Sequence, residues 1–547
     1  MANLLTQICV GKTSIRNWRN FLKIKMYRCT LLILCCFIPT HFATAQDLKP
    51  IIAKAMPACV RMWGFDTLQQ QRTSAQFSGV VVEDNFILTA AHVVTPGSTY
   101  KIFFPDGEEA IAQALGKIEL LEDRTRPDVA LMKILKGKAR SGVVISLADI
   151  HLGDPCISIA YPESLDQVQP TIRLGKIIEP LNNRGFIHST ALMEPGDSGG
   201  PLFNLNGELI GLHSAIEKSE SANYDVPVNL YQKYWSALQK PVVYRSWPEM
   251  ADTVQRQQET TSFTWPKAGN YTGTCVRLTS RINGQTQTVL ATVIQSVVVS
   301  KSSMVGDSVF IYGKQGVIIA RDKAHDLVLI RPSQRLKGLK IKRVNYPHPG
   351  DVLFAPVIDS IVTGILSGGP LELHKTTSAA FLGATPVHGS IPERIYFVRP
   401  GSPAAQQDIR IGDIIPGLND SLSSHWPGDT LLLKLQRGSQ TLLKNIVLIY
   451  PPQMLHDHPA DHFIGGRSQR RDGFQAVYST DIILRPEECG GPVFDAQNHF
   501  AGINIARFSR ANSVLIGAET IRQFITDSLH EPIPKRSGRP VRMGGAY

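Results

Sequence analysis

The chain has 547 residues, of which 43% are hydrophobic, and a formal net charge of +11. This length predicts three or four domains. The first 45 residues hold six of the 57 Lys/Arg and none of the 46 Asp/Glu, so the rest of the chain carries a net charge near +5. Such a mild charge does not indicate nucleic-acid binding.

Residues 1–45 are predicted to be a secretory signal peptide. A basic start at residues 26–28 precedes the apolar run 31–39, and the small residues 43–45 offer a cleavage site before Gln46. The apolar run is too short to span a membrane, and no later segment is long enough. The sequence thus predicts an exported protein, periplasmic or secreted, with no membrane span.

Four of the eight cysteines lie in this leader, and Cys59, Cys156, Cys275 and Cys489 remain. They form no CxxC pair and no evident disulfide framework. We therefore expect them to be buried thiols.

Three later segments each place one polar residue beside an apolar, strand-like run. They are LTAAHVV with His92, DVALM with Asp128 and PGDSGGPLF with Ser198. Taken singly, each of these residues more often serves a turn or a core than a reaction. Together, in the chain order His, Asp, Ser, they match one of the arrangements that serine proteases use.

Acyl transfer gives each residue a role. Ser198 supplies the hydroxyl nucleophile, His92 the base, and Asp128 the acid that orients the imidazole. Gly196 has no Cβ, so its backbone can turn until its N–H and that of Ser198 converge on a developing oxyanion. This chemistry calls for no cofactor and no metal.

Residues 55–238 resemble a trypsin-type (chymotrypsin-fold) serine protease of the bacterial HtrA/Deg branch, in which a strand like LIGLHSAI at 209–216 follows the nucleophile. The segment 224–227 then leads into a predicted helix at 228–240, where Leu230, Tyr234 and Leu238 share one face. The resemblance implies a two-barrel β domain that cleaves unfolded or damaged proteins. By analogy, it also implies a hydrogen bond between Ser214 and Asp128.

The resemblance also locates a substrate pocket. Leu192 stands six residues before Ser198, where trypsin-like enzymes place the pocket floor, and Ala215 with Ile216 should line one wall. This predicts a shallow apolar pocket and cleavage after small apolar residues. At Asp197 the chain departs from the HtrA pattern, which usually has Asn at this position. Digestive trypsins have an Asp there and pair it with a freshly cleaved N-terminus. The sequence does not identify a partner for Asp197.

The second half of the chain repeats the first. CVRM at 59–62 returns as CVRL at 275–278, DVAL at 128–131 returns as DLVL at 326–329, and PGDSGGPLF returns as PEECGGPVF at 486–494. A closing helix is expected again, at 519–529. The sequence predicts a second trypsin-type domain.

The chemistry of this second domain is predicted to be lost. Ser303 stands where the base should be, and Glu487 replaces the oxyanion glycine. Cys489 occupies the nucleophile position without a base, and we expect the neighbouring carboxylates to raise its pKa. A structural pseudoprotease domain is the favoured interpretation over a catalytic Cys489.

A different module interrupts the second domain. Segments FLGA at 381–384, VRPGSPAA at 398–405, IGDII at 411–415 and PGDT at 427–430 resemble a PDZ domain of the HtrA kind. PDZ domains bind peptide C-termini by adding a strand to a sheet edge, against a helix. Only residues 416–426 remain for that helix, so the groove is expected to lack a wall; peptide binding and a spacer role stay open.

The cluster of His456, Asp457, His458, Asp461 and His462 lacks the spacing of a metal site, and we interpret it as a solvated loop. The basic stretch 467–471 is assigned to a solvated loop in the same way.

The predicted architecture is all-β, with two trypsin-like double β-barrel domains and a PDZ-like module. The predicted boundaries are a signal peptide at 1–45, a protease domain at 46–240, a linker at 241–265, a protease-like domain at 266–378 and 453–530 interrupted by the PDZ-like insertion at 379–452, and a basic tail at 531–547.

The predicted function is an exported serine endopeptidase acting on unfolded proteins or peptides. The alternative is a latent or non-proteolytic, chaperone-like peptide-binding protein. Peptide C-termini are a candidate partner of the PDZ-like module, no nucleic acid is expected, and the oligomeric state is left open.

Overall fold

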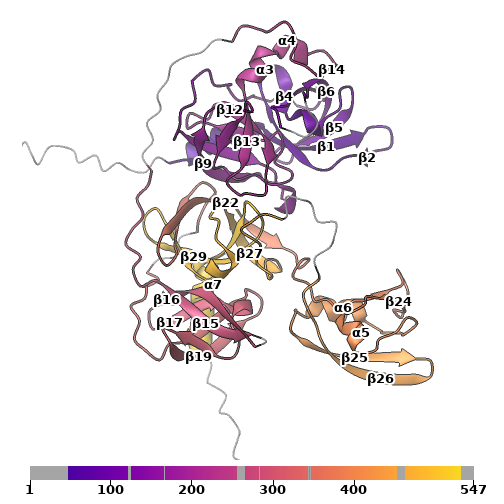
Figure 1. Cartoon of the computed structure of the whole chain (residues 1–547), viewed down its shortest axis with the longest axis vertical. Helices are drawn as coiled ribbons and strands as arrows, with labels where there is room; N and C mark the ends of the chain where they lie inside the picture. The colour runs from indigo at the N-terminus through magenta and orange to yellow at the C-terminus, as the bar shows by residue number, and fades with distance from the viewer. Residues whose placement is uncertain are drawn as a thin grey trace, which may run out of the picture. The chain divides into compact units, whose positions relative to one another are not determined.

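The computed structural model describes residues 47–120, 125–138, 140–165, 167–254, 265–282, 284–342, 344, 346–452 and 462–530 (Figure 1). The predicted signal peptide, the basic tail and most of the His/Asp cluster at 456–462 lie outside the described residues. Within the described part of the chain, no helix is long and apolar enough to cross a membrane.

The first half of the domain predicted at 46–240 is one sheet in the strand order β14-β6-β5-β1-β3-β4-β7, and β6 also pairs with β7. Its core-facing residues alternate along β6, as expected for strands with one buried side. The strands are β1 (Cys59–Asp66), β2 (Gln71–Arg72), β3 (Phe77–Val81), β4 (Phe86–Thr89), β5 (Thr99–Phe103), β6 (Glu109–Ile118), β7 (Val129–Lys136) and β14 (Val243–Tyr244).

The second half of this domain is a closed barrel in the order β10-β13-β12-β11-β8-β9. Its strands are β8 (Pro155–Ala160), β9 (Thr171–Glu179), β10 (Ile187–Ser189), β11 (Pro201–Phe203), β12 (Leu209–Ile216) and β13 (Asn223–Pro227). Short helices connect and flank the strands: α2 (Lys49–Ala55), η1 (Met56–Ala58), η2 (Glu83–Asn85), η3 (Ala91–Val93) and η4 (Glu163–Leu165).

The helix predicted at 228–240 is wrong in detail. The structure has two short helices, α3 (Asn229–Lys233) and α4 (Trp235–Leu238), separated at Tyr234. Of the predicted face, Tyr234 and Leu238 are buried and Leu230 is partly buried against the core. Tyr231 is buried as well, and its hydroxyl donates to the carbonyl of Thr89 at 2.7 Å.

Ordered structure also continues into the range 241–265 that was predicted as a linker. Val243 and Tyr244 form β14, which pairs in parallel with Lys117 and Ile118 of β6. The backbone of Val242 accepts a further hydrogen bond from Lys117 at 3.0 Å.

The second repeat folds into two closed barrels. One holds β15 (Cys275–Ile282), β16 (Gln285–Ile294), β17 (Val297–Lys301), β18 (Val309–Ile311), β19 (Lys314–Asp322) and β20 (Leu327–Arg331). The other holds β21 (Val352–Pro356), β22 (Ile361–Leu373), β27 (Phe474–Thr480), β28 (Pro492–Asp495), β29 (Phe500–Arg507) and β30 (Ser513–Gly517). Two short helices accompany them, η5 (Ser302–Met304) and η7 (Pro486–Glu488).

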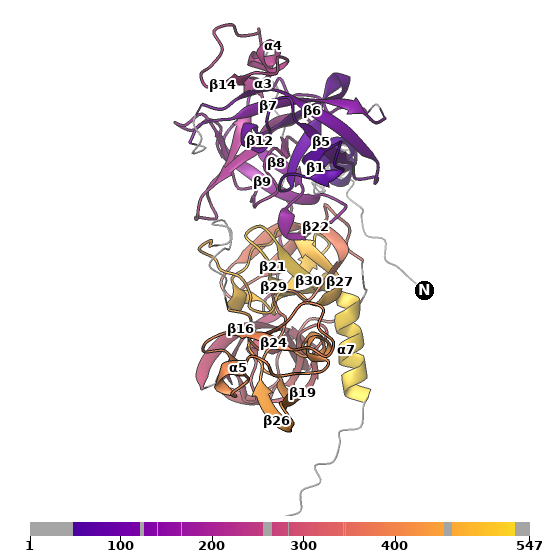
Figure 2. The same ribbon diagram turned by 90° about the vertical axis from the view of Figure 1, so that its right-hand side faces the viewer.

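The closing helix predicted at 519–529 is confirmed as α7 (Ala518–His530), drawn in yellow in Figure 2. It buries Ala518 and Ile521 against the barrel core. The all-β fold class with double barrels is thus confirmed.

The insertion between β22 and β27 has a core of its own, which includes Leu382, Ile415, Leu418 and Leu435. Its elements are β23 (Ala384–Pro386), β24 (Ile395–Val398), α5 (Pro403–Gln406), α6 (Leu418–Ser424), β25 (Thr430–Arg437) and β26 (Gln440–Val447). The short span 416–426 holds α6, a helix of seven residues that buries Leu418. The missing wall of the groove stays a prediction.

Candidate active site

The loop before β11 carries Ser198 on a tight turn. Gly196 has φ +96° and Gly199 has φ +80°, which side chains other than glycine rarely adopt. A Cβ on Gly196 would also collide with the backbone of residues 161–163. The glycines of GDSGGP are therefore required by the turn itself.

His92 and Asp128 come from neighbouring strands. His92 lies in η3 just after β4, and Asp128 directly precedes β7. The two strands pair with Thr89 opposite Ala130, which brings the two residues together. Asp128 Oδ2 accepts from the backbone N–H of His92 and lies 2.9 Å from its Nδ1.

The imidazole of His92 links this carboxylate to the serine. Its Nε2 lies 3.0 Å from Ser198 Oγ. When the ring proton is on Nδ1, facing Asp128, Nε2 is free to accept the serine proton. The structure therefore brings His92, Asp128 and Ser198 into one hydrogen-bonded series, although they are far apart in the sequence.

Asp128 is buried and has a second partner. Ser214 on β12 donates from Oγ to Asp128 Oδ1 at 2.5 Å, so the hydrogen bond predicted by analogy is present. Burial by itself would raise the pKa of Asp128, but the charge of His92 and the hydrogen bonds from His92 and Ser214 outweigh it and hold that pKa below its usual value. The carboxylate is thus kept ionised beside the imidazole.

The two candidate oxyanion donors are available. In the described part of the chain, neither the Gly196 nor the Ser198 N–H donates to another protein group. Ser78 on β3 binds the carbonyl groups of both residues. Its Oγ donates to the Gly196 carbonyl at 2.8 Å, and its N–H donates to the Ser198 carbonyl at 2.9 Å. The sequence analysis missed Ser78; a buried serine inside an apolar strand was the only signal.

Asp197 also has a partner that the sequence analysis did not find. Arg173 on β9 lies with its Nη1 2.6 Å from Asp197 Oδ2, and both side chains are buried. No motif surrounds Arg173 in the sequence. Its only signal is a cation between Ile172 and Leu174 in a strand.

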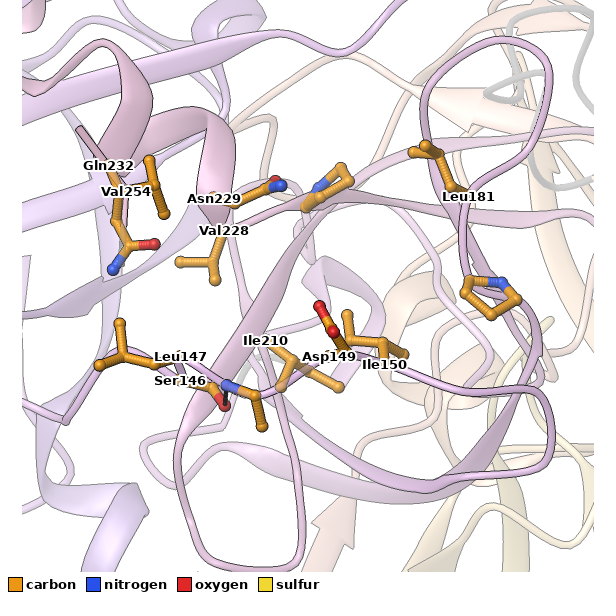
Figure 3. A pocket seen from close by; sticks show the side chains of 13 residues that line it. Ser146, Leu147, Asp149, Ile150, Leu181, Ile210, Val228, Asn229, Gln232 and Val254 are labelled. Carbon is orange, nitrogen blue, oxygen red and sulfur yellow. Dashed lines mark hydrogen bonds between the residues drawn. The ribbon is translucent and has the colours of Figure 1, made fainter. Parts of the chain in front are cut away.

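The predicted substrate-pocket residues Leu192, Ala215 and Ile216 are all half-buried. A pocket of about 320 Å³ lies elsewhere in the domain, among side chains such as Ile210 and Val228 (Figure 3). Among the described residues that line it, none is a predicted pocket or triad residue. The specificity pocket therefore stays a prediction.

In the second domain the corresponding positions are arranged differently. Ser303, at the position of His92, donates from Oγ to Asp326 Oδ2 at 2.8 Å. The buried Lys301 ammonium lies 2.8 Å from the same oxygen and takes the place of an imidazole beside Asp326. A neutral base is thus replaced by a fixed cation.

Cys489, at the position of Ser198, contacts Ser468 Oγ at 3.8 Å and donates to the carbonyl of Arg485 at 3.7 Å. Its thiol pKa is raised, as predicted, but the cause is burial and not the neighbouring carboxylates. Within the described residues no imidazole contacts it.

The four cysteines after the predicted leader are free thiols, and Cys59, Cys156 and Cys489 are buried while Cys275 is half-buried. Buried thiols are thus confirmed in the main. Among the described residues, no group of three or more His, Cys, Asp or Glu side chains could hold a metal ion.

The fold and this geometry define a trypsin-like peptidase domain. Residues 77–212 match the family model described as "Trypsin-like peptidase domain". Over 183 residues, the chain is 31% identical to the periplasmic serine endoprotease DegP of Salmonella typhimurium, with 31% of this chain and 37% of that protein covered.

Two further relatives agree. The DegP protein of Escherichia coli K12 is 30% identical over 185 residues, which cover 31% of this chain and 37% of that protein. The serine protease HTRA1 of Xenopus tropicalis is 31% identical over 199 residues, which cover 34% of this chain and 42% of that protein. The chain spans about two fifths of the length of these relatives. The predicted resemblance is confirmed: the first domain is similar to trypsin-like serine proteases of the HtrA/Deg type.

Proposed function

We propose that the protein is an exported serine endopeptidase that cleaves unfolded or damaged proteins in its first domain. One observation carries the proposal. The hydroxyl of Ser198, the imidazole of His92 and the carboxylate of Asp128 are joined by hydrogen bonds of 2.9–3.0 Å, and the N–H groups of Gly196 and Ser198 have no acceptor among the described residues.

In the proposed mechanism, Ser198 Oγ attacks the scissile carbonyl while His92 Nε2 takes its proton. Asp128 holds the tautomer and stabilises the imidazolium that forms. The Gly196 and Ser198 N–H groups bind the oxyanion of the tetrahedral intermediate. His92 then gives its proton to the leaving amine, and water repeats the sequence on the acyl-enzyme.

The alternative, a latent or non-proteolytic peptide-binding protein, would be favoured by a broken hydrogen-bond series or by blocked donors. The connected side chains argue against it. Export to the periplasm or beyond is part of the proposal and is supported by the predicted leader and by the printed names of the periplasmic relatives. Capture of peptide C-termini by the insertion is proposed as an accessory activity.

The test is labelling of the full chain with a fluorophosphonate probe, which forms an ester only with an activated serine. Wild-type protein should be labelled and Ser198→Ala should not. Ser141→Ala, which removes an exposed hydroxyl of the same domain, is the matched control and should label like the wild type. An unlabelled but folded wild-type protein would favour the latent alternative.

A further inference from the structure

The turn that carries Ser198 is bound to the barrel wall by a buried ion pair. Arg173 Nη1 lies 2.6 Å from Asp197 Oδ2, and the two side chains are 0% and 1% exposed. Asp197 Oδ2 also accepts the backbone N–H of Glu194 at 2.8 Å. Asp197 Oδ2, at the centre of the turn, therefore contacts both Arg173 on β9 and Glu194 at the start of the turn.

The backbone of Asp197 is fixed as closely as its side chain. Its N–H donates to the Glu194 carbonyl at 3.1 Å, and its carbonyl accepts from Gly200 at 2.7 Å. Asp197 stands between Gly196 and Ser198, whose N–H groups are the candidate oxyanion donors. A displacement of Asp197 therefore moves both donors.

The charges around this pair are few and all buried. Glu194 Oε1 lies 3.7 Å from Arg173 Nη2 and accepts from Ser164 Oγ at 2.8 Å and from Asn512 Nδ2 at 2.6 Å. Burial raises the pKa of Glu194, while Arg173 lowers it and Asp197 raises it. The Arg173 guanidinium thus faces the carboxyl groups of Asp197 and Glu194 and also acts on Asp481, while Arg510 also lies near Glu194.

We propose that Arg173 is a positioning residue for the oxyanion-binding turn, with its guanidinium serving as a permanent internal partner for Asp197. Without its partner, the buried Asp197 carboxylate would turn toward water, because an unpaired buried charge is strongly unfavourable. This movement would release the Glu194 N–H and shift the turn. The pair therefore allows an acidic residue beside the nucleophile without a newly cleaved N-terminus.

This inference rests on the proposed function of Ser198, and the experiment separates the two. The wild-type protein, Arg173→Met, Asp197→Asn and the double variant are compared in full-length form for fluorophosphonate labelling, kcat, KM and thermal melting. Arg184→Met, which removes a surface arginine paired to Glu217 at 3.2 Å, is the matched control.

Arg173→Met should lower kcat and the labelling rate by about 100-fold, the effect of losing one oxyanion donor, with a smaller change in KM. The double variant removes the charge of Asp197 together with its partner, and the amide oxygen that Asp197→Asn introduces can still accept the Glu194 N–H. Its kcat should therefore return to within about tenfold of the wild type. Arg184→Met should leave kcat and KM unchanged.

The inference would be overturned if the wild type is labelled and the kcat of Arg173→Met stays within about threefold of the wild-type value. This result would leave the proposed function intact. A double variant that melts like the wild type but stays as inactive as Arg173→Met would also overturn it. If Arg173→Met does not fold, the double variant alone decides between these outcomes. No labelling of the folded wild type would instead reject the proposed function.

Discussion

The Ser214 hydroxyl donates to Asp128 Oδ1, the carboxylate oxygen that His92 leaves free, at 2.5 Å. His92 binds Oδ2 through both its backbone N–H and Nδ1. The carboxylate is therefore held at both oxygens, and its plane is fixed relative to the imidazole.

Replacement of Ser214 by Ala should loosen this arrangement. A hydrogen bond to a charged group contributes about 1.5–3 kcal/mol, so kcat should fall by about 10- to 100-fold with little change in KM. Steady-state kinetics on an unfolded protein or a peptide substrate measures this, with Ser141→Ala as the control. A kcat within about twofold of the wild type would show that Ser214 does not orient Asp128.

The series of Ser198 and His92 should behave as one catalytic unit. Ser198→Ala should abolish cleavage of an unfolded protein, with a loss of up to about a million-fold, and His92→Ala should lose about as much. The double variant should be scarcely slower than either single one, because each change already disables proton transfer and attack together. Additive losses in kcat would contradict the assignment.

The proposed pocket predicts cleavage after Val, Ala, Leu or Ile. Leu192 at the proposed floor offers no carboxylate, so a Lys or Arg side chain would be desolvated there without a partner. Profiling with a peptide library and mass spectrometry identifies the residue before each cut. A profile dominated by Arg or Lys would reject the pocket assignment, and Leu192→Asp should shift preference toward them if it is right.

Asp472 should make stability depend on pH. Its carboxylate accepts from Thr376, Thr377 and Ser378, where the chain enters the insertion, at distances of 2.6–3.2 Å. Burial by itself would raise the pKa of Asp472, but the hydrogen bonds from Thr377 and Ser378 outweigh it and lower that pKa. Stabilisation is then present above the unfolded-state pKa of about 3.9 and is lost as pH falls through the lower folded-state value.

The variant Asp472→Ala should lower the free energy of unfolding by about 2–4 kcal/mol at pH 7, since each buried donor left unsatisfied costs about 1–3 kcal/mol. The difference from the wild type should shrink below about pH 3. Calorimetric melting at both pH values measures it, and the exposed Asp359→Ala serves as the control. An equal loss at both pH values would mean that the charge of Asp472 contributes nothing.

The sequence predicted His92, Asp128 and Ser198 because short motifs hold them beside strands whose pairing follows from the resemblance. It did not predict Arg173 or Ser78, because each depends on a contact that the closed fold creates with the Ser198 turn, over 24 and 118 residues respectively. Such pairings leave no local pattern.

Local spacing described the structure only in part in two other places. The periodicity of Leu230, Tyr234 and Leu238 favoured one helix with one buried face. Tyr234 and Leu238 are buried as that face predicts, but the helix divides at Tyr234, and Tyr231 is buried as well through its contact with Thr89. The short span between IGDII and PGDT holds α6, a helix of seven residues, and the predicted missing wall of the groove stays a prediction.

The last prediction concerns the second domain, which should be inert as a protease. Lys301 donates from Nζ to Asp326 and to the carbonyls of Arg470 and Ile505, each at 2.8 Å. These three hydrogen bonds fix the ammonium beside Asp326, where a catalytic imidazole would have to bind. Ser303 occupies the other approach to Asp326. Burial raises the pKa of the Cys489 thiol, which disfavours the thiolate that a cysteine nucleophile requires.

Cys489→Ala should therefore leave peptidase kcat and KM unchanged, and so should the control Cys275→Ala. In the Ser198→Ala background, a thiol-reactive iodoacetamide probe should modify folded protein no faster at Cys489 than at buried Cys156, because both thiols are buried and protonated. If Cys489→Ala lowered turnover as severely as Ser198→Ala while the melting temperature stayed at the wild-type value, the second domain would contain an active site of its own. If turnover is retained, the barrels of the second domain have a supporting role. Deletion of residues 266–547 should then leave a first domain that still reacts with the fluorophosphonate but captures substrate differently.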